Sequence, residues 1–199
     1  MVPAVKTASW AGDPPHRNAA RERLLAAARQ CIARDGLKAT GIAAVAKQAG
    51  VSRPTVYRYF RNRTELVQAA LLGAGQAFAR EVAHDVGRIQ RPAEMAVESV
   101  LGIVVRIPDD PLLGEVWRSV SIDSDAARGF TGPLAIEMTR RSLAALVDAA
   151  GWDDAEADEA CETIMRFVFS LLAAPEPHRS KAELRGYLMR RLVPSLGLA

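Results

Sequence analysis

Residues 39–66, ATGIAAVAKQAGVSRPTVYRYFRNRTEL, constrain the fold of this 199-residue chain more than any other stretch. Ile42 and Val45 begin an apolar pattern with helical spacing, which predicts a short helix with one buried face. Gly50 predicts the end of that helix, because glycine readily adopts the left-handed conformation that closes many helices. Ser52 predicts the N-cap of a second helix. The stretch therefore predicts two short helices joined by a tight turn.

The second of these helices has only a narrow apolar edge. Val56 and Phe60, four residues apart, predict that edge. Two short helices that cross at a tight turn containing glycine form a helix-turn-helix motif, in which the second helix reads bases in the major groove of DNA. The remaining residues suit such a helix because they are basic, hydroxylated or aromatic with a polar tip: Arg53, Thr55, Tyr57, Arg58, Tyr59, Arg61 and Arg63.

The same residues resemble the signature of the TetR family of transcriptional regulators. That signature includes Gly-Val-Ser, an aliphatic residue followed by Tyr, a Phe three residues later and a Lys-Glu-x-Leu-like start to the next helix. The resemblance covers about the first third of the chain, and the residues that carry it are Thr40, Ile42, Val45, Ala46, Gly50, Val51, Ser52, Tyr57 and Phe60. It implies an all-α fold of about nine helices, three for DNA binding and the others for ligand binding and dimerisation.

Two positions depart from the family pattern. Gly41 stands where the family usually has a second Thr or Ser, which often caps the first helix of the motif and touches a phosphate. The resemblance therefore implies no contact for Gly41 and leaves Thr40 as the candidate cap. Arg63 stands where Lys is usual, which preserves a charge that can bind phosphate through a forked guanidinium.

The resemblance also implies which side chains meet DNA. Arg53 is expected to read a guanine, with a phosphate contact as the alternative. Tyr57 either gives its hydroxyl to a phosphate or braces the helix against the core. The full set comprises Ser52 as the cap, Arg53, Pro54, Thr55 and Tyr59 near bases, and Thr40, Lys47, Tyr57, Arg58 and Arg63 near phosphates.

The charge distribution agrees with a DNA-binding N-terminal region. Residues 1–66 hold 12 Lys or Arg and 4 Asp or Glu, a net charge of +8, whereas the remaining residues hold 14 and 19, a net charge of −5. A basic N-terminal third is typical of a module that binds phosphates. The acidic remainder argues against a sequence-indifferent architectural DNA-binding protein, which is the alternative function and would spread positive charge more widely.

Other features of the sequence indicate a cytoplasmic regulator without cofactor or metal. No apolar run reaches the roughly 18 residues that a membrane span needs, and no secretory signal is evident. Cys31 and Cys161 are far apart and are expected to be free thiols. The three histidines are scattered, and neither a Gly-x-Ser-x-Gly motif nor a phosphate loop is present, so the sequence does not indicate an enzyme.

Hydrophobic spacing and Pro or Gly punctuation predict three regions. Residues 1–16 are expected to form a flexible arm, residues 17–63 a helix-turn-helix domain and residues 64–199 a helical regulatory domain. Asn62 or Thr64 is the expected cap of a long helix that ends near residue 84. Further helices are expected at 92–107, 112–120, 133–150, 155–174 and 181–193, with a loop at 121–131 and with Pro194 ending the last helix. Gly36 and Gly151 are expected to end the helices that precede them, and Asp153, Asp154 and Glu156 are expected to place negative charge at the start of the helix at 155–174.

Two sets of apolar residues are assigned to partners of the regulatory domain. A ligand pocket is expected to be lined by Phe78, Met95, Ile103, Trp117, Phe130 and Met138, for which a place in the ordinary core is the alternative. The polar candidates for that pocket are Arg106, Arg118, Asp123 and Glu137. A homodimer interface is expected at Cys161, Ile164, Met165, Val168, Leu172 and Leu188, with burial inside one subunit as the alternative.

These observations predict a sequence-specific regulator that binds double-stranded DNA as a homodimer. Repression of a palindromic operator is the family default, with release by a small apolar or amphipathic ligand. An activator of the same fold is the alternative.

Overall fold

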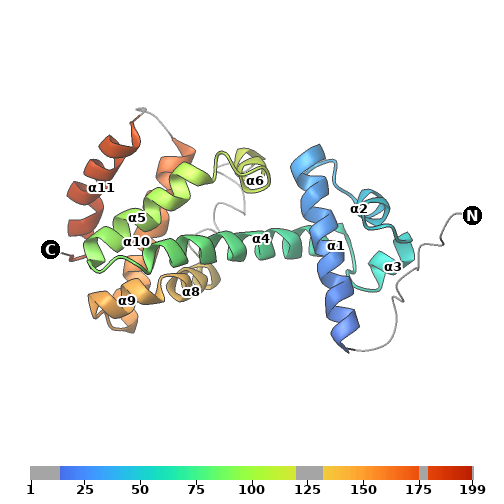
Figure 1. Ribbon diagram of the computed structural model, residues 1–199, viewed down its shortest axis with the longest axis horizontal. Coiled ribbons are helices and arrows are strands. Elements are labelled where there is room, and N and C mark those ends of the chain that lie inside the picture. Colours follow the sequence, from blue (N-terminus) through green and yellow to red (C-terminus); the bar gives the residue numbers. More distant parts are fainter. Residues whose placement is uncertain (1–13, 120–131, 175–178, 199) are drawn as a thin grey trace, which may run out of the picture. The chain divides into compact units, whose positions relative to one another are not determined.

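The computed structural model describes residues 14–119, 132–174 and 179–198 (Figure 1). These described residues form ten helices and no strand, which confirms the predicted all-α class. The chain divides into two compact units, Met1–Ala74 and Gly75–Ala199. The division falls inside α4 (Arg63–Val86), so this helix begins in the first unit and ends in the second. The boundary expected from the sequence lies at the start of that helix.

The first unit contains α1 (Pro14–Asp35), α2 (Ile42–Ala49), α3 (Arg53–Tyr57) and the first half of α4. Helix α1 packs against α2, and α2 packs against α3. The core between them contains Leu24, Leu25, Ala28, Ile32, Val45, Val56, Phe60, Leu66 and Ala70.

Helix α1 starts within the segment that was expected to be a flexible arm. That prediction is wrong for residues 14–16, which are helical. The physical reason is that proline is tolerated in the first helical turn, where the backbone N–H has no helical acceptor. Residues 1–13 of the expected arm lie outside the described residues.

The predicted helix ends of the first unit are confirmed. Gly36 and Gly50 have φ values of 85° and 69°, in the left-handed region that favours glycine. The side chain of Ser52 accepts a hydrogen bond from the backbone N–H of Thr55 and caps α3. The side chain of Asn62 accepts from the backbone N–H of Glu65 at 2.9 Å, so Asn62 rather than Thr64 caps α4.

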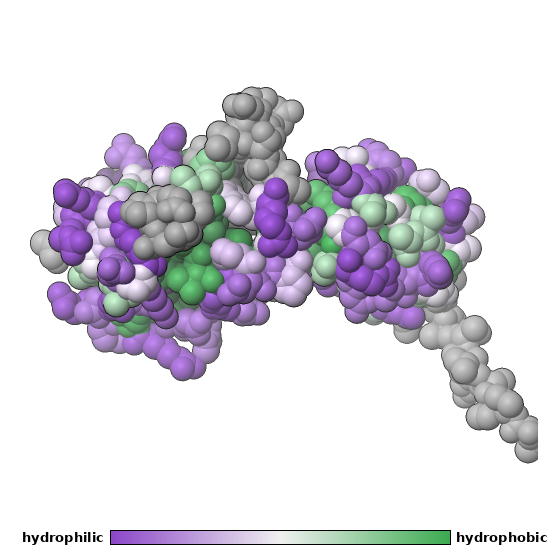
Figure 2. Space-filling model, turned by 90° about the horizontal axis from the view of Figure 1, so that it is seen from above, coloured by the Kyte–Doolittle hydropathy of each residue, from purple (hydrophilic) through white to green (hydrophobic). Residues whose placement is uncertain are grey.

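The second unit is organised around α5 (Pro92–Arg106), which packs against α9 (Ala144–Ala150), α10 (Asp154–Ala173) and α11 (Lys181–Ser195). Helix α8 (Pro133–Ser142) packs on α10, and α6 (Leu113–Ser119) follows α5. In the view of Figure 2, apolar areas on this unit lie among hydrophilic residues. The most deeply buried side chains of its core include Val97, Val100, Leu101, Leu146, Ile164, Leu188 and Leu192.

Two predicted helices of this unit differ from the structure. The expected single helix at 133–150 is divided at Leu143, whose φ of −103° and ψ of 20° are not helical and whose side chain is buried. The last helix does not end at Pro194 but runs to Ser195. A proline so close to a helix end removes only one hydrogen bond, and the turn is completed by Gly197 with a φ of 66°.

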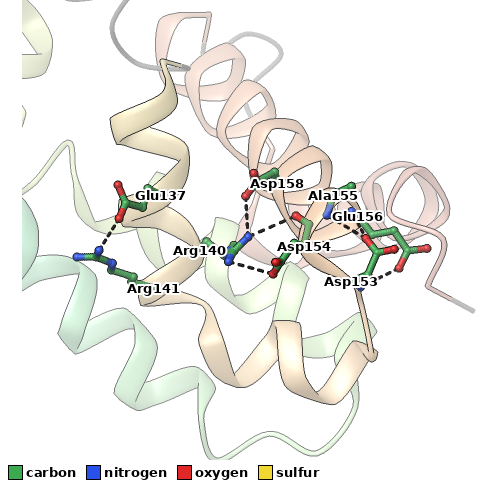
Figure 3. A network of polar contacts seen from close by, with 8 residues as sticks. All are labelled: Glu137, Arg140, Arg141, Asp153, Asp154, Ala155, Glu156 and Asp158. Atoms are coloured by element: carbon green, nitrogen blue, oxygen red, sulfur yellow. Dashed lines mark hydrogen bonds and ion pairs between the residues drawn. The ribbon is translucent and has the colours of Figure 1, made fainter.

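Ion pairs connect α8 to the start of α10 (Figure 3). The guanidinium of Arg140 forms ion pairs with Asp154 at 3.1 Å and with Asp158 at 3.2 Å. Asp153 and Glu156 form a reciprocal capping box at the start of α10, which confirms the predicted acidic N-terminus of that helix. The charged residues of this region therefore pair with one another.

Both cysteines are free thiols, as predicted, and both are buried within the chain. Burial raises the pKa of the Cys161 thiol to about 11 and also raises the pKa of the Cys31 thiol. None of the helices in the described ranges combines the length and the apolar character needed to cross a bilayer. Within the same ranges, no three His, Cys, Asp or Glu side chains are grouped as a metal ion would require.

Candidate nucleic-acid interface

Helices α2 and α3 are joined by a turn whose hydrogen bonds fix their crossing. The left-handed conformation of Gly50 allows the backbone N–H of Val51 to bond the carbonyl of Ala46 at 2.9 Å. The hydroxyl groups of Ser52 and Thr55 lie 2.9 Å apart and form a hydrogen bond across the first turn of α3. Ser52 therefore acts through its cap, and its hydroxyl is already engaged within the protein.

Helix α3 has a narrow buried apolar edge and an exposed polar surface. Val56 is fully buried and Phe60, in the turn after α3, is 1% exposed. On the outer side Tyr57 is 55% exposed, which favours a contact outside the core over a brace against it. Arg53, Pro54 and Arg58 are also exposed, whereas Thr55 and Tyr59 are half-buried. The helix is shorter than predicted, since it ends at Tyr57 and continues as a turn.

Three basic side chains of this motif are available to a partner. Lys47 on α2 and Arg53 and Arg58 on or beside α3 are exposed. None of the three forms an ion pair or a side-chain hydrogen bond with another described residue. Exposed cations without an ion-pair partner among the described residues attract a polyanion, because each phosphate contact releases a condensed counterion.

Two residues expected at phosphates are engaged inside the first unit instead. Thr40 is 1% exposed, and its hydroxyl donates to the carbonyl of Gly36 at 2.9 Å. This hydroxyl neither caps α2, whose N-cap is Gly41 without a side-chain bond, nor faces solvent. Arg63 donates from Nε to the carbonyl of Thr40 at 2.6 Å and from its terminal nitrogen to the carbonyl of Leu37. The phosphate assignments of Thr40 and Arg63 are therefore not supported by this geometry.

The side chains that connect α1 to α2 follow no pattern in the sequence. Arg34 donates to Gln48 at 3.1 Å, and Gln48 donates to Gln30 at 2.8 Å. Arg34 also donates to Asp35, and this bond lowers the pKa of the carboxyl group. These partners are separated by up to 18 positions in the chain, so helical spacing alone could not have paired them.

Four of the six residues expected at a ligand pocket lie in or against the core of the second unit: Met95, Phe78, Ile103 and Trp117. Met95 is 2% exposed and lies in the core of the second unit, which favours the alternative assignment. Trp117 donates from Nε1 to the carbonyl of Leu172 at 3.1 Å and meets the ring of Phe169 edge-on. Three of the remaining residues, Phe78, Ile103 and Met138, are half-buried, and Phe130 lies outside the described residues.

A groove in the second unit is lined mainly by charged residues. It lies between α4 and α5 and contains none of the six expected pocket residues. Arg106, a polar pocket candidate, forms ion pairs across it with Glu81 at 2.8 Å and Asp85 at 3.1 Å. The other polar candidates, Arg118 and Glu137, have ion-pair partners on their own helices, and Asp123 lies outside the described residues. The groove is lined by Ala77, Arg80, Glu81, His84, Asp85 and Arg106.

The residues expected at a dimer interface lie in the core of their own unit. Each is at most 8% exposed in the single chain, so burial inside one subunit, the alternative assignment, accounts for their apolar character. Thr139 of α8 also donates to the sulfur of Met165 at 3.2 Å, which is a contact within the chain. The six residues are Cys161, Ile164, Met165, Val168, Leu172 and Leu188.

The fold and this exposed basic motif define a helix-turn-helix DNA-binding protein. Residues 24–70 match the family described as "Bacterial regulatory proteins, tetR family". Residues 24–70 therefore carry the DNA-binding domain of the TetR family, and the chain is similar over most of its length to DNA-binding transcriptional regulators. The family consists of regulators rather than enzymes, which agrees with the sequence analysis.

Relatives and solved structures extend the likeness beyond the motif. An uncharacterized HTH-type transcriptional regulator of Mycobacterium tuberculosis is 28% identical over 182 residues, which cover 88% of this chain and 84% of that relative. The TetR family repressor AlkX from Dietzia sp. strain DQ12-45-1b, implicated in biodegradation of n-alkanes, is 26% identical, with a TM-score of 0.64. That likeness covers 89% of this chain and 96% of AlkX.

Two further structures share the fold at lower identity. RolR in complex with resorcinol is 20% identical, with a TM-score of 0.64 over 93% of this chain and 95% of RolR. The multidrug binding protein EbrR complexed with imidazole is 22% identical, with a TM-score of 0.62 over 96% of each chain. Both likenesses extend over most of this chain, so the two solved structures share the helical fold of the second unit as well as that of the first.

Proposed function

We propose that this regulator is a homodimeric repressor that binds a palindromic operator through α2 and α3 and is released by a small apolar or amphipathic ligand. The observation that carries the proposal is the exposed N-terminal end of α3, where Arg53 and Pro54 follow a capped turn. The buried edge formed by Val56 and Phe60 holds α3 on the core of the first unit. A helix held in this way, with exposed polar side chains at its N-terminal end, suits base recognition in the major groove.

Base and phosphate contacts have different roles in this proposal. Arg53 reads a guanine through its forked guanidinium, while Pro54, Thr55 and Tyr59 lie near neighbouring bases. Lys47, Tyr57 and Arg58 contact phosphates, which fix the orientation of the motif and supply much of the affinity.

A homodimer supplies the second motif that a palindromic site needs. The half-buried residues Thr163, Phe167 and Leu171 follow one another at intervals of four on α10 and support this assembly. Half-buried Tyr187 and Met189 add apolar surface on α11. We therefore assign the dimer contact to this partly exposed stripe, because the side chains first expected at the interface already pack inside the chain.

Sedimentation equilibrium tests the dimer. The wild-type protein is expected to sediment at twice the chain mass of 21.5 kDa. Phe167→Arg places a charge in the stripe and is expected to shift the equilibrium toward monomer, whereas Arg141→Ala on the exposed side of α8 leaves it unchanged. A wild-type protein that remains monomeric at micromolar concentration contradicts the dimer.

The ligand part of the proposal follows from the solved relatives. Resorcinol and imidazole are the molecules bound to RolR and EbrR, and AlkX is implicated in n-alkane biodegradation. The molecules bound to RolR and EbrR, and the role of AlkX, support a small apolar or amphipathic ligand in the second unit of this protein. Such a ligand relieves repression only if it binds the DNA-incompetent arrangement more tightly than the competent one. A ligand that raises the thermal midpoint but leaves operator affinity unchanged is not an inducer.

The central test is selection of bound fragments from a random duplex pool at two salt concentrations. Recovery of one inverted repeat at both concentrations supports a dimeric, sequence-specific regulator and gives the half-site spacing. Recovery of no motif, with binding that fades as salt rises, supports the architectural alternative instead. Transcription from a promoter that carries the selected site then separates repression from activation.

A further inference from the structure

Arg63 occupies the first position of α4, where its charge would ordinarily be unfavourable. The N-terminal end of a helix carries partial positive charge from its free backbone N–H groups, so a cation there is not stabilised by its own helix. The side chain of Arg63 instead reaches the loop between α1 and α2. Its Nε donates to the carbonyl of Thr40 at 2.6 Å, and its terminal nitrogen donates to the carbonyl of Leu37.

The loop that receives these bonds sets the start of α2. It leaves α1 at Gly36, whose φ of 85° reverses the chain, and the buried hydroxyl of Thr40 donates back to the Gly36 carbonyl at 2.9 Å. Gly41 follows as the N-cap of α2, and its carbonyl accepts the first helical bond, from Val45, at 3.0 Å. Arg63 thus binds the residue immediately before the cap of α2.

The shape of the guanidinium matters for this contact. Arginine presents several N–H donors in one rigid plane, so it can bond two carbonyls while its orientation stays fixed. Lysine carries one compact ammonium group on a flexible stem and cannot reproduce that planar pair. A phosphate contact requires a positive charge but not this planar pair of donors, so either arginine or lysine can make it.

We infer that Arg63 is a positioning residue, which clamps the loop before α2 to the first turn of α4 and so fixes the orientation of the α2–α3 pair for DNA. The inference rests on the proposed operator binding. It assigns to Arg63 a role distinct from that of Lys47 and Arg58, which contact phosphates directly in the proposed function. Helix α3 is tied to α2 by the turn at Gly50, so the clamp acts on both helices.

Operator affinity as a function of salt distinguishes a clamp from a phosphate contact. We would compare Arg63→Ala, Arg63→Lys and Arg58→Ala on the selected operator and on a random duplex, at a temperature where circular dichroism shows all three folded. Both Arg63 variants are expected to bind the operator about ten-fold more weakly, with a lower operator-to-random ratio and an unchanged salt slope. Arg58→Ala is expected to reduce the slope of log affinity against log salt by about 0.9.

Hydrogen exchange of the DNA-free protein measures the clamp itself. The Val45 amide makes the first helical bond of α2, so it is expected to exchange about ten-fold faster in both Arg63 variants than in the wild type. An unchanged exchange rate overturns the clamp. A wild-type protein that selects no operator refutes the proposed function instead, while the exchange result still decides the clamp.

Two further results overturn the inference. Restoration of wild-type affinity by Arg63→Lys, together with a reduced salt slope for Arg63→Ala, is the behaviour of a phosphate contact. Unchanged operator affinity and base preference in the folded variants, with only a lower thermal midpoint, shows that Arg63 contributes to stability and not to the orientation of the reading helices.

Discussion

The arginines on or beside α3 in the first unit and three arginines of the second unit are used differently. In the first unit Arg53 and Arg58 are exposed, and neither forms an ion pair with another described residue. In the second unit Arg106, Arg140 and Arg185 each pair with a carboxylate from another helix. The arginines at α3 therefore suit an external polyanion, whereas these three arginines of the second unit make contacts between helices. The net charges of the two regions, +8 for residues 1–66 and −5 for the remainder, reflect the same difference.

The largest effect is expected from substitutions in the cores of the two units. Phe60→Ala removes a ring that is 1% exposed, and Leu188→Ala removes a fully buried side chain. Each is expected to lower the free energy of unfolding by about 2–5 kcal/mol, through lost burial and the cavity that remains. Urea denaturation measures both losses.

The two core substitutions should differ in their effect on DNA. Phe60 supports α3, so Phe60→Leu, which keeps the protein folded, is expected to weaken operator binding. Leu188→Ala should leave the operator affinity of the folded protein unchanged, because Leu188 lies in the second unit. Equal operator affinity for Phe60→Leu and the wild type contradicts the supporting role of Phe60.

The next effect concerns base reading by α3. Arg53→Ala is expected to lose about 1–3 kcal/mol of discrimination at one symmetric pair of operator positions, which is the value of a bidentate contact to guanine. Repeated selection from a random pool measures it. Arg141→Ala is the matched control, since it removes an exposed arginine that pairs with Glu137 in the second unit. A uniform loss across all sequences would show that Arg53 contacts a phosphate.

A smaller effect is expected from the helix caps, which occur in both units. Ser52 accepts from the Thr55 amide at 3.3 Å, and Asp153 accepts from the Ala155 amide at 2.9 Å. Substitution of either cap by Ala is expected to lower the free energy of unfolding by about 1 kcal/mol. Only Ser52→Ala should also weaken operator binding, because only this cap lies at the start of α3. Thermal denaturation and operator titration separate the two effects.

The sequence predicted features that depend on neighbours along the chain. The helix stops at Gly36, Gly50 and Gly151 are confirmed, because a positive φ is a local property that glycine favours. The cap at Ser52 and the apolar edge of α3 are local in the same sense. Each needs only a few consecutive residues, and this is why the reading motif could be located from the sequence alone.

Contacts between distant residues were not predicted. Arg63 meets the carbonyls of Leu37 and Thr40, which lie 26 and 23 positions away, and no periodic pattern links such partners. The sequence also could not show that Cys161 and Leu188, which were assigned to a dimer interface, pack inside their own chain. Apolar spacing shows that one face of a helix is buried, but it does not show whether the same chain or a second subunit covers that face.

The smallest predicted effect is on the stability of the free protein, and it distinguishes an arginine in an ion pair from an arginine assigned to DNA. Arg141→Ala breaks an exposed pair with Glu137 four residues earlier and is expected to lower the free energy of unfolding by about 0.3–0.5 kcal/mol. That loss should shrink as salt rises, since exposed charges are screened. Arg53→Ala removes no described ion pair and should not destabilise the free protein, because it relieves repulsion in a basic region. Differential scanning calorimetry at two salt concentrations measures both, and a larger loss for Arg53→Ala contradicts the assignment of that side chain to DNA rather than to the fold.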